Sequence, residues 1–173
     1  MPPAIPPQGG TRSLGADFAV PADQRYFEDY LPGSVHEYGY VTVTEPEIVE
    51  FARRFDPQPI HTDPAFAAAG PFGGLIASGW HTAGIMMRLI ADHFLSRVAS
   101  LASPGVDELR WPTPLRPGDR LHLRVTILQA RPSRSKPDRG IVHTRAELIN
   151  GHDQPVLTLT AVNILRRRPA APG

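Results

Sequence analysis

The longest apolar segment of the chain, residues 75–98, constrains the fold more than any other part of the sequence. It is apolar on nearly all sides until Arg88, Asp92 and His93. A helix with this pattern is predicted to be buried within a protein rather than to lie on its surface. The segment is too short and too polar at its ends to cross a membrane. Other elements of the chain must therefore surround this helix.

The sequence after Gly105 supplies such elements, because its hydrophobic period changes to two. Residues 121–127 place Leu, Leu, Val and Ile at every second position, which predicts a half-buried strand. A turn around Asn150-Gly151 is expected to join the last two strands. The other strands of this half are predicted over residues 106–111, 141–148 and 156–165.

The segment before the long helix contains one strand and two shorter helices. Residues 35–43 are rich in Val, Tyr and Thr and predict a strand. Thr44 and Glu47 have the spacing of a capping box for a helix over residues 45–54. Asp63 precedes a proline as the N-cap of an Ala-rich helix, so we assign it a structural role. The order of elements predicts an α+β fold in which an antiparallel sheet wraps around a central helix.

Length and composition limit the classes of protein that this chain can represent. Its 173 residues suit a single domain, expected over residues 25–167, with a disordered Pro- and Gly-rich tail over 1–24 and a flexible tail over 168–173. The 18 basic and 17 acidic residues argue against nucleic acid or an anionic membrane as a partner. The absence of cysteine excludes a disulfide framework and a thiolate nucleophile. No signal or membrane-spanning pattern is found, so a cytoplasmic protein is expected.

The segment Asp56-Pro57-Gln58-Pro59-Ile60-His61 places an acid and an imidazole five positions apart. Its two prolines fix φ and restrict the residues before them, which favours an extended, non-helical conformation. A stiff segment of this kind holds two titratable side chains at a set separation, as acid–base catalysis requires. The alternative is a Pro-rich turn after a helix, with Asp56 as a turn residue and His61 as an ordinary half-buried histidine.

Residues 56–64 resemble the hydratase motif of MaoC-like dehydratases and (R)-specific enoyl-CoA hydratases, Gly-Asp-x-Asn-Pro-x-His. The resemblance continues through residues 72–81 and 114–119, and in all covers residues 38–165. It implies a hot-dog fold and a hydro-lyase that adds water to a trans-2-enoyl-CoA to give an (R)-3-hydroxyacyl-CoA, or eliminates it. It also implies a homodimer or higher homo-oligomer, with no metal and no cofactor apart from the coenzyme A of the substrate.

The resemblance also assigns roles to individual residues. Asp56 and His61 match the pair that binds one water molecule and moves the protons. We assign the α-carbon proton to His61 and the water or hydroxyl to Asp56. Gly79 matches the glycine at a helix N-terminus whose backbone N–H stabilises the thioester oxyanion. Tight helix packing by a small residue is the structural alternative for Gly79, and both interpretations can hold.

The chain departs from the family motif at two positions. Phe55 replaces the first glycine and is expected to reshape the acyl pocket. Gln58 replaces the asparagine and keeps its amide, which is expected to steady the loop of the acid–base pair. Trp80 is expected to line the acyl channel or to belong to the core, and Ser78 is expected to contact substrate.

Three cations, Arg134, Lys136 and Arg139, lie in a loop between two predicted strands. They are expected to bind the phosphates of coenzyme A, from the same or a neighbouring subunit, or to form a solvated hairpin loop. His61, His81 and Asp63 do not have the spacing of a familiar metal site. Two rival functions remain open: a hot-dog thioesterase, and a non-catalytic acyl-CoA-binding subunit.

Overall fold

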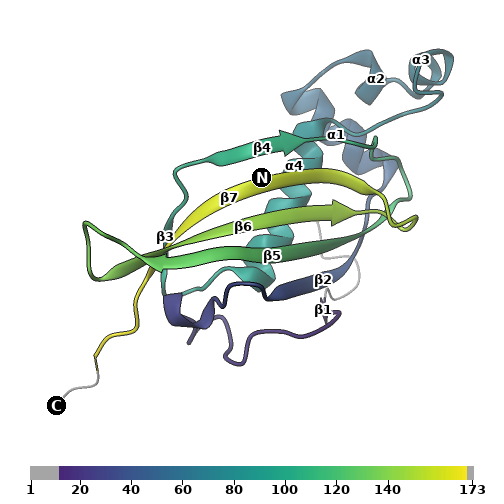
Figure 1. Ribbon diagram of the computed structural model, residues 1–173. Helices are drawn as coiled ribbons and strands as arrows, with labels where there is room; N and C mark the ends of the chain where they lie inside the picture. The colour runs from purple at the N-terminus through teal and green to yellow at the C-terminus, as the bar shows by residue number, and fades with distance from the viewer. Residues whose placement is uncertain (1–11, 171–173) are drawn as a thin grey trace.

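The computed structural model describes residues 12–170, in which seven antiparallel strands form one sheet that curves around helix α4 (Figure 1). This is the predicted α+β hot-dog fold. The strands are β1 (Arg12–Ser13), β2 (Val35–Thr42), β3 (Ser100–Ala102), β4 (Val106–Arg110), β5 (Arg120–Pro132), β6 (Arg139–Ile149) and β7 (Pro155–Arg166). The helices are a 3₁₀ turn (Phe27–Asp29), α1 (Glu45–Phe55), α2 (Pro59–Thr62), α3 (Pro64–Ala69) and α4 (Gly79–Leu89), which continues as a π-helical turn (Ile90–Phe94).

The order of the strands in the sheet is β1-β2-β5-β6-β7-β3, and β4 also pairs with β7. The long strands β5, β6 and β7 form its centre. Helices α1, α2 and α3 gather at the end of the sheet where β5 begins, and the β5–β6 connection lies at the opposite end (Figure 1). The acid–base segment, residues 56–61, and the cationic loop between β5 and β6 therefore lie at opposite ends of the sheet.

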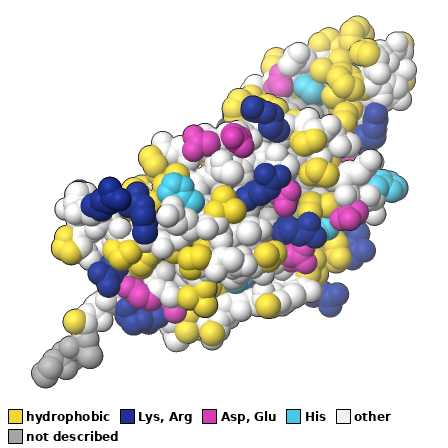
Figure 2. Space-filling model, viewed as in Figure 1, with side chains coloured by type: hydrophobic (Ala, Val, Ile, Leu, Met, Phe, Trp, Pro, Cys, Tyr) yellow, Lys and Arg dark blue, Asp and Glu magenta, His cyan; other side chains and the backbone are white. Residues whose placement is uncertain are grey.

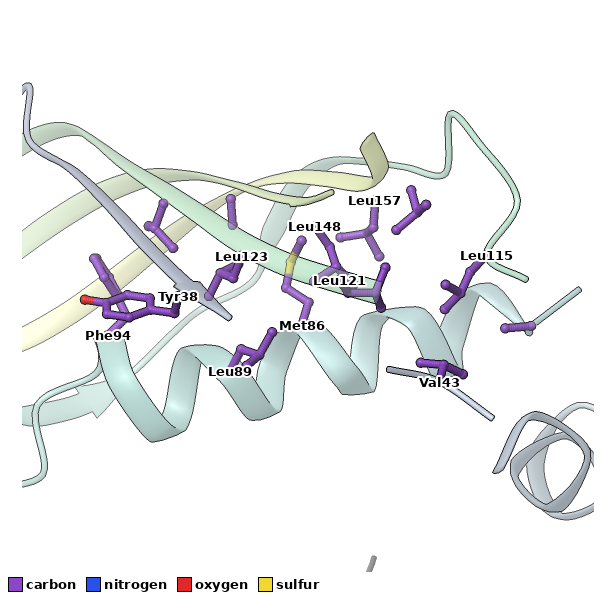
Figure 3. Close-up of a cluster of buried hydrophobic side chains, with 14 of the residues drawn as sticks. Tyr38, Val43, Met86, Leu89, Phe94, Leu115, Leu121, Leu123, Leu148 and Leu157 are labelled. Atoms are coloured by element: carbon purple, nitrogen blue, oxygen red, sulfur yellow. The ribbon is translucent and has the colours of Figure 1, made fainter. Parts of the chain in front are cut away.

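The core lies between α4 and the concave face of the sheet (Figure 3). Met86 and Leu89 of α4, together with Phe94, are each only 1% exposed. The alternation predicted over 121–127 is confirmed, because its four apolar side chains are at most 1% exposed. Burying a side chain of this size stabilises the fold by about 1.5–3 kcal/mol. The sheet side chains facing the helix include Tyr38, Leu121, Leu123, Leu148 and Leu157.

The central helix is shorter and less buried than the sequence predicted. It begins at Gly79, the position expected for its N-terminus, and not at residue 75, where the apolar segment starts, because the residues before Gly79 are extended and Ala77 N–H donates to the Leu115 carbonyl at 2.8 Å. Its predicted burial on all sides was wrong for the single chain, since Trp80 is 63% and Met87 49% exposed. The face toward the sheet is covered, and His81 near the start of the helix packs against Phe51 of α1, whereas Trp80 and Met87 lie on the uncovered side.

The predicted N-terminal tail over 1–24 was too long. Arg12 and Ser13 pair with β2, the Tyr38 hydroxyl donates to Asp17 Oδ1 at 2.8 Å, and the Phe18 ring stacks on His36 at 4.1 Å. Residues 1–11 and 171–173 of the predicted tails lie outside the described residues. At the other end, Arg168 donates to Glu28 and Asp29. No helix between residues 12 and 170 is long and apolar enough to cross a membrane.

Both predicted helix caps are present. Thr44 and Glu47 form the capping box of α1, and Asp63 Oδ1 accepts from the N–H groups of Ala65 and Phe66 at 2.9 and 3.1 Å. Replacing Asp63 by Ala should therefore lower the free energy of unfolding by about 1 kcal/mol, because two helix donors lose their acceptor. Urea denaturation of the variant would measure this. Asp63→Asn is the control, since it retains a capping oxygen, and equal stability of the Ala and Asn variants would contradict the prediction.

Candidate functional site

Asp56 and His61 face each other across the connection between α1 and α2. His61 Nε2 lies 3.5 Å from Asp56 Oδ2. Asp56 is the C-cap of α1, and Gln58 is extended, as the prolines predicted. The prediction that the whole segment is non-helical was wrong, because Pro59 begins the single turn of α2 that carries His61. Proline is well suited to this first helical position.

The tautomer of His61 follows from its hydrogen bond. Its Nδ1 lies 2.8 Å from the backbone carbonyl oxygen of Ile76, and a carbonyl can only accept. Nδ1 therefore carries a proton, and in the neutral ring Nε2 presents a lone pair on the side of Asp56. His61 is only 5% exposed, so the ring is held in this orientation. No sequence pattern indicated Ile76, which contributes to the site through its backbone carbonyl.

Two side chains hold the carboxylate of Asp56. Gln58 Nε2 donates to Oδ1 and Ser78 Oγ donates to Oδ2, each at 2.7 Å. These hydrogen bonds, with a smaller contribution from His61, keep the pKa of Asp56 below its usual range, against the opposing effect of partial burial. Gln58 thus holds the acid with its amide, as expected. The result is an ionised carboxylate whose Oδ2 faces Nε2 of the imidazole at 3.5 Å.

Ser78 has a different role from the one predicted. It is fully buried, so it is not a direct contact for substrate. Its Oγ donates to Asp56 and accepts from Trp80 N–H at 3.2 Å, which makes it the N-cap of α4. One hydroxyl therefore connects the acid to the first turn of the central helix.

Gly79 is the first residue of α4 and lies against the indole ring of Trp111. An added Cβ at Gly79 would come within 2.5 Å of Trp111 Cε2, far inside van der Waals contact. Trp111 Nε1–H also donates to the Gly79 carbonyl at 2.9 Å. The tight-packing interpretation of Gly79 is confirmed by this geometry. Trp111 was missed in the sequence, where it was noted only as the end of a strand before Pro112.

The aromatic residues expected to shape the acyl channel lie largely at the surface of the chain. The Trp80 ring is 63% exposed and meets Trp111 edge-on, with centroids 5.6 Å apart. Phe55 is 61% exposed, and its ring packs against the Phe51 ring of the same helix and not against the Asp56 side chain. His81 is buried and stacks on Phe51 at 4.7 Å, and burial lowers its pKa. Phe55 therefore lies at the rim of the site.

Arg134, Lys136 and Arg139 lie at the other end of the sheet from Asp56. Strand β5 separates the two ends by 13 residues, which corresponds to about 40 Å. Lys and Arg side chains gather over that end in Figure 2. Arg139 also donates twice to Asp138, at 2.8 Å for each bond. The prediction that this loop serves the site of its own subunit was wrong, which leaves the site of a neighbouring subunit or a solvated hairpin loop.

No group of three His, Cys, Asp or Glu side chains in the described part of the chain is arranged to hold a metal ion. The titratable groups of the site are the acid and the imidazole. Around them lie a serine hydroxyl, a glutamine amide and a helix N-terminus. This set can orient a small polar group and transfer a proton to or from it.

Comparison with known proteins places this chain in a family. The model of the MaoC like domain matches residues 32–148. A MaoC-like dehydratase structure from Rhodospirillum rubrum is 40% identical, with a TM-score of 0.79, over 84% of this chain and 99% of that one. 3-Hydroxybutyryl-CoA dehydratase of Methylorubrum extorquens is 31% identical over 64% of this chain and 69% of its own length. For 3-hydroxyacyl-thioester dehydratase Z of Mycobacterium tuberculosis the identity is 35%, over 54% of this chain and 64% of the relative. The chain belongs to the MaoC-like dehydratase family.

Proposed function

We propose that the protein is a hydro-lyase that interconverts a trans-2-enoyl-CoA and the corresponding (R)-3-hydroxyacyl-CoA. The observation that carries this proposal is that Asp56 Oδ2 and His61 Nε2 lie 3.5 Å apart. His61 Nδ1 is hydrogen-bonded to the Ile76 carbonyl and is therefore not available to the substrate. The named relatives in the family, a 3-hydroxybutyryl-CoA dehydratase and a 3-hydroxyacyl-thioester dehydratase, support the same class of reaction and substrate.

The two facing acceptors suit a water molecule or a β-hydroxyl group. A water beside the pair can donate one hydrogen to Asp56 and the other to His61 Nε2, since both atoms accept. Its oxygen lone pairs then point away from the pair, toward the β-carbon of a bound enoyl thioester. Asp56 remains an acceptor at neutral pH because its pKa is lowered by Gln58 and Ser78.

In the elimination, His61 moves the proton and Asp56 holds the hydroxyl group that leaves. His61 Nε2 takes the α-proton of the 3-hydroxyacyl thioester, and the resulting imidazolium is stabilised by the Asp56 carboxylate. The electron pair passes to the thioester oxygen as an enolate. The C–O bond at the β-carbon then breaks, the hydroxyl held by Asp56 takes the proton from His61, and water leaves. Hydration is the reverse sequence.

The enolate oxygen needs hydrogen-bond donors, which we assign to the first turn of α4. Backbone N–H groups at a helix N-terminus lack intrahelical acceptors, and the helix dipole favours negative charge there. Gly79 begins the helix at its junction with Ser78, which bonds to Asp56. The oxyanion donors and the acid–base pair are therefore joined through one residue.

We also propose that the protein acts as a homodimer. Trp80 and Met87 leave apolar surface on the uncovered face of α4, which a second copy of the chain would bury. A neighbouring subunit would also be needed for Arg134 and Lys136 to reach the phosphates of coenzyme A. The single chain alone does not bring that loop to Asp56.

The decisive experiment follows the ultraviolet absorbance of the enoyl thioester on a panel that includes crotonyl-CoA and branched and dicarboxylic enoyl-CoAs. Loss of absorbance without release of free coenzyme A would support the hydro-lyase. Release of free coenzyme A would favour the rival thioesterase. Binding of acyl-CoA without turnover of any substrate would favour a non-catalytic binding subunit.

Replacing Ser78 by Ala should raise the pKa of the Asp56 carboxyl, which an NMR titration of that carboxyl would measure. Ser78 is one of two donors that hold this pKa below its usual range, so its loss lets the pKa rise. The ionised carboxylate disappears as pH falls, so the variant loses it at a higher pH than the wild type. Ser96→Ala is the control, because it removes another buried hydroxyl that bonds to the Arg25 carbonyl. An Asp56 pKa that is the same in the wild type and in Ser78→Ala would contradict the assignment.

A further inference from the structure

We propose that Trp111 is a positioning residue that fixes the oxyanion-binding end of α4 through the Gly79 carbonyl. This inference rests on the proposed function, because the N–H groups that it would orient are those assigned to the thioester oxygen. Trp111 follows β4, whose Arg110 pairs with Thr158 of β7, and precedes Pro112. The ring is therefore attached to the edge of the sheet, and not to the helix that it contacts.

The peptide between Gly79 and Trp80 is held at both of its polar atoms. Trp111 Nε1–H donates to the Gly79 oxygen at 2.9 Å, and the Trp80 N–H donates to Ser78 Oγ at 3.2 Å. A peptide group is planar, so fixing its oxygen and its hydrogen fixes its orientation. Ser78 in turn donates to Asp56 Oδ2 at 2.7 Å. A continuous path of hydrogen bonds and one peptide group thus connects Trp111 to the acid.

The Trp111 ring also occupies the space that a side chain at residue 79 would need. Cε2, Cζ2 and Cδ2 of the ring would lie 2.5, 2.8 and 2.9 Å from an added Cβ. The ring packs against the Gly79 Cα on one side, and its N–H holds the Gly79 carbonyl. The Gly79 N–H belongs to the preceding peptide, and because Gly79 is helical, contacts that hold its carbonyl and limit its movement also restrain that peptide. Donors that are oriented before the reaction stabilise developing charge better than donors that must reorganise.

Trp111→Phe tests this role, because it keeps an aromatic ring and removes the donor to Gly79. We expect kcat for hydration of the best enoyl-CoA on the panel to fall about tenfold, because an oxyanion donor that is no longer held in place stabilises the transition state less well. KM should stay within about twofold, since ground-state binding is not the affected quantity. Tyr30→Phe is the matched control, because it also keeps an aromatic ring and removes a side-chain donor to a backbone carbonyl, that of Phe94 at 2.9 Å, and leaves the Gly79 bond intact. Its kcat should stay near the wild-type value.

Urea denaturation of the variants separates positioning from general damage. If Trp111→Phe is destabilised, the test moves to an isosteric analogue. In a Trp80→Phe background Trp111 is the single tryptophan of the chain and can be replaced by benzothienylalanine, a ring of the same shape without the N–H. The same background with tryptophan at position 111 is the reference for kcat. A tenfold loss of kcat in the folded protein that carries the analogue would support the inference.

The possible outcomes distinguish this inference from the proposed function. Wild-type turnover together with unchanged kcat in the variants that lack the Trp111 N–H would overturn the role of Trp111 and leave the hydro-lyase intact. An equal loss of kcat in Tyr30→Phe would also overturn it, because the effect would then not depend on the Gly79 bond. No turnover by the wild-type protein on any thioester would overturn both.

Discussion

Asp56→Asn should lower kcat for enoyl-CoA hydration by a factor of about 10²–10⁴, the usual contribution of a positioned acid or base. The substitution keeps the size of the side chain and its place at the end of α1. It removes the negative charge that orients the water and stabilises the imidazolium form of His61. It also removes the acceptor whose pKa Gln58 and Ser78 hold low.

This prediction depends on the fold remaining intact in the variant. The Asn side chain retains one oxygen and can still accept from Gln58 or Ser78, so a small change in the free energy of unfolding is expected. Asp63→Asn is the control within the same segment, because that acid caps α3 and has no assigned part in the reaction. Full activity of Asp56→Asn would exclude a catalytic role for the Asp56 carboxylate and would support the alternative that Asp56 is a turn residue.

Much of the fold was predictable because its determinants are local. The alternation over residues 121–127 gave a strand with its apolar side chains buried, since side chains in a strand point alternately to its two faces. Thr44 and Asp63 marked helix starts, because a cap depends on residues two or three positions away. The pair Asp56 and His61 was found for the same reason, since the stiff segment between them is short.

The features that sequence reasoning missed depend on contacts between distant parts of the chain. Trp111 reaches Gly79 across 32 positions, and Ser78 reaches Asp56 across 22. The order of residues 12–24 depends on pairing with β2 and on the Phe18–His36 stack, neither of which composition records. The cationic loop was assigned to the site from its charge alone, and the length of β5 places it at the far end of the sheet.

Gly79→Ala should lower kcat by a factor of about 10²–10³, the effect of losing one oxyanion donor. The added methyl group would lie 2.5 Å from the Trp111 ring, so the first turn of α4 or the ring must move. Either movement changes the direction of the Gly79 N–H, and we expect overpacking to lower the free energy of unfolding by about 1–3 kcal/mol. Gly105→Ala is the control, because an added Cβ there meets nothing within 4 Å. Kinetics and urea denaturation of both variants would measure these effects.

The double variant Gly79→Ala with Trp111→Ala separates the two ways in which the methyl group can act. If the methyl group acts by colliding with the ring, removing the ring makes room for it. The double variant should then be no less active than Trp111→Ala alone, and the two substitutions should be strongly non-additive, as expected for residues in contact. A further loss of about 10²-fold in the double variant would instead show that the methyl group obstructs the thioester directly. Gly79 would then be required for the approach of substrate to the helix N-terminus, and its packing against Trp111 would not explain why glycine is needed there.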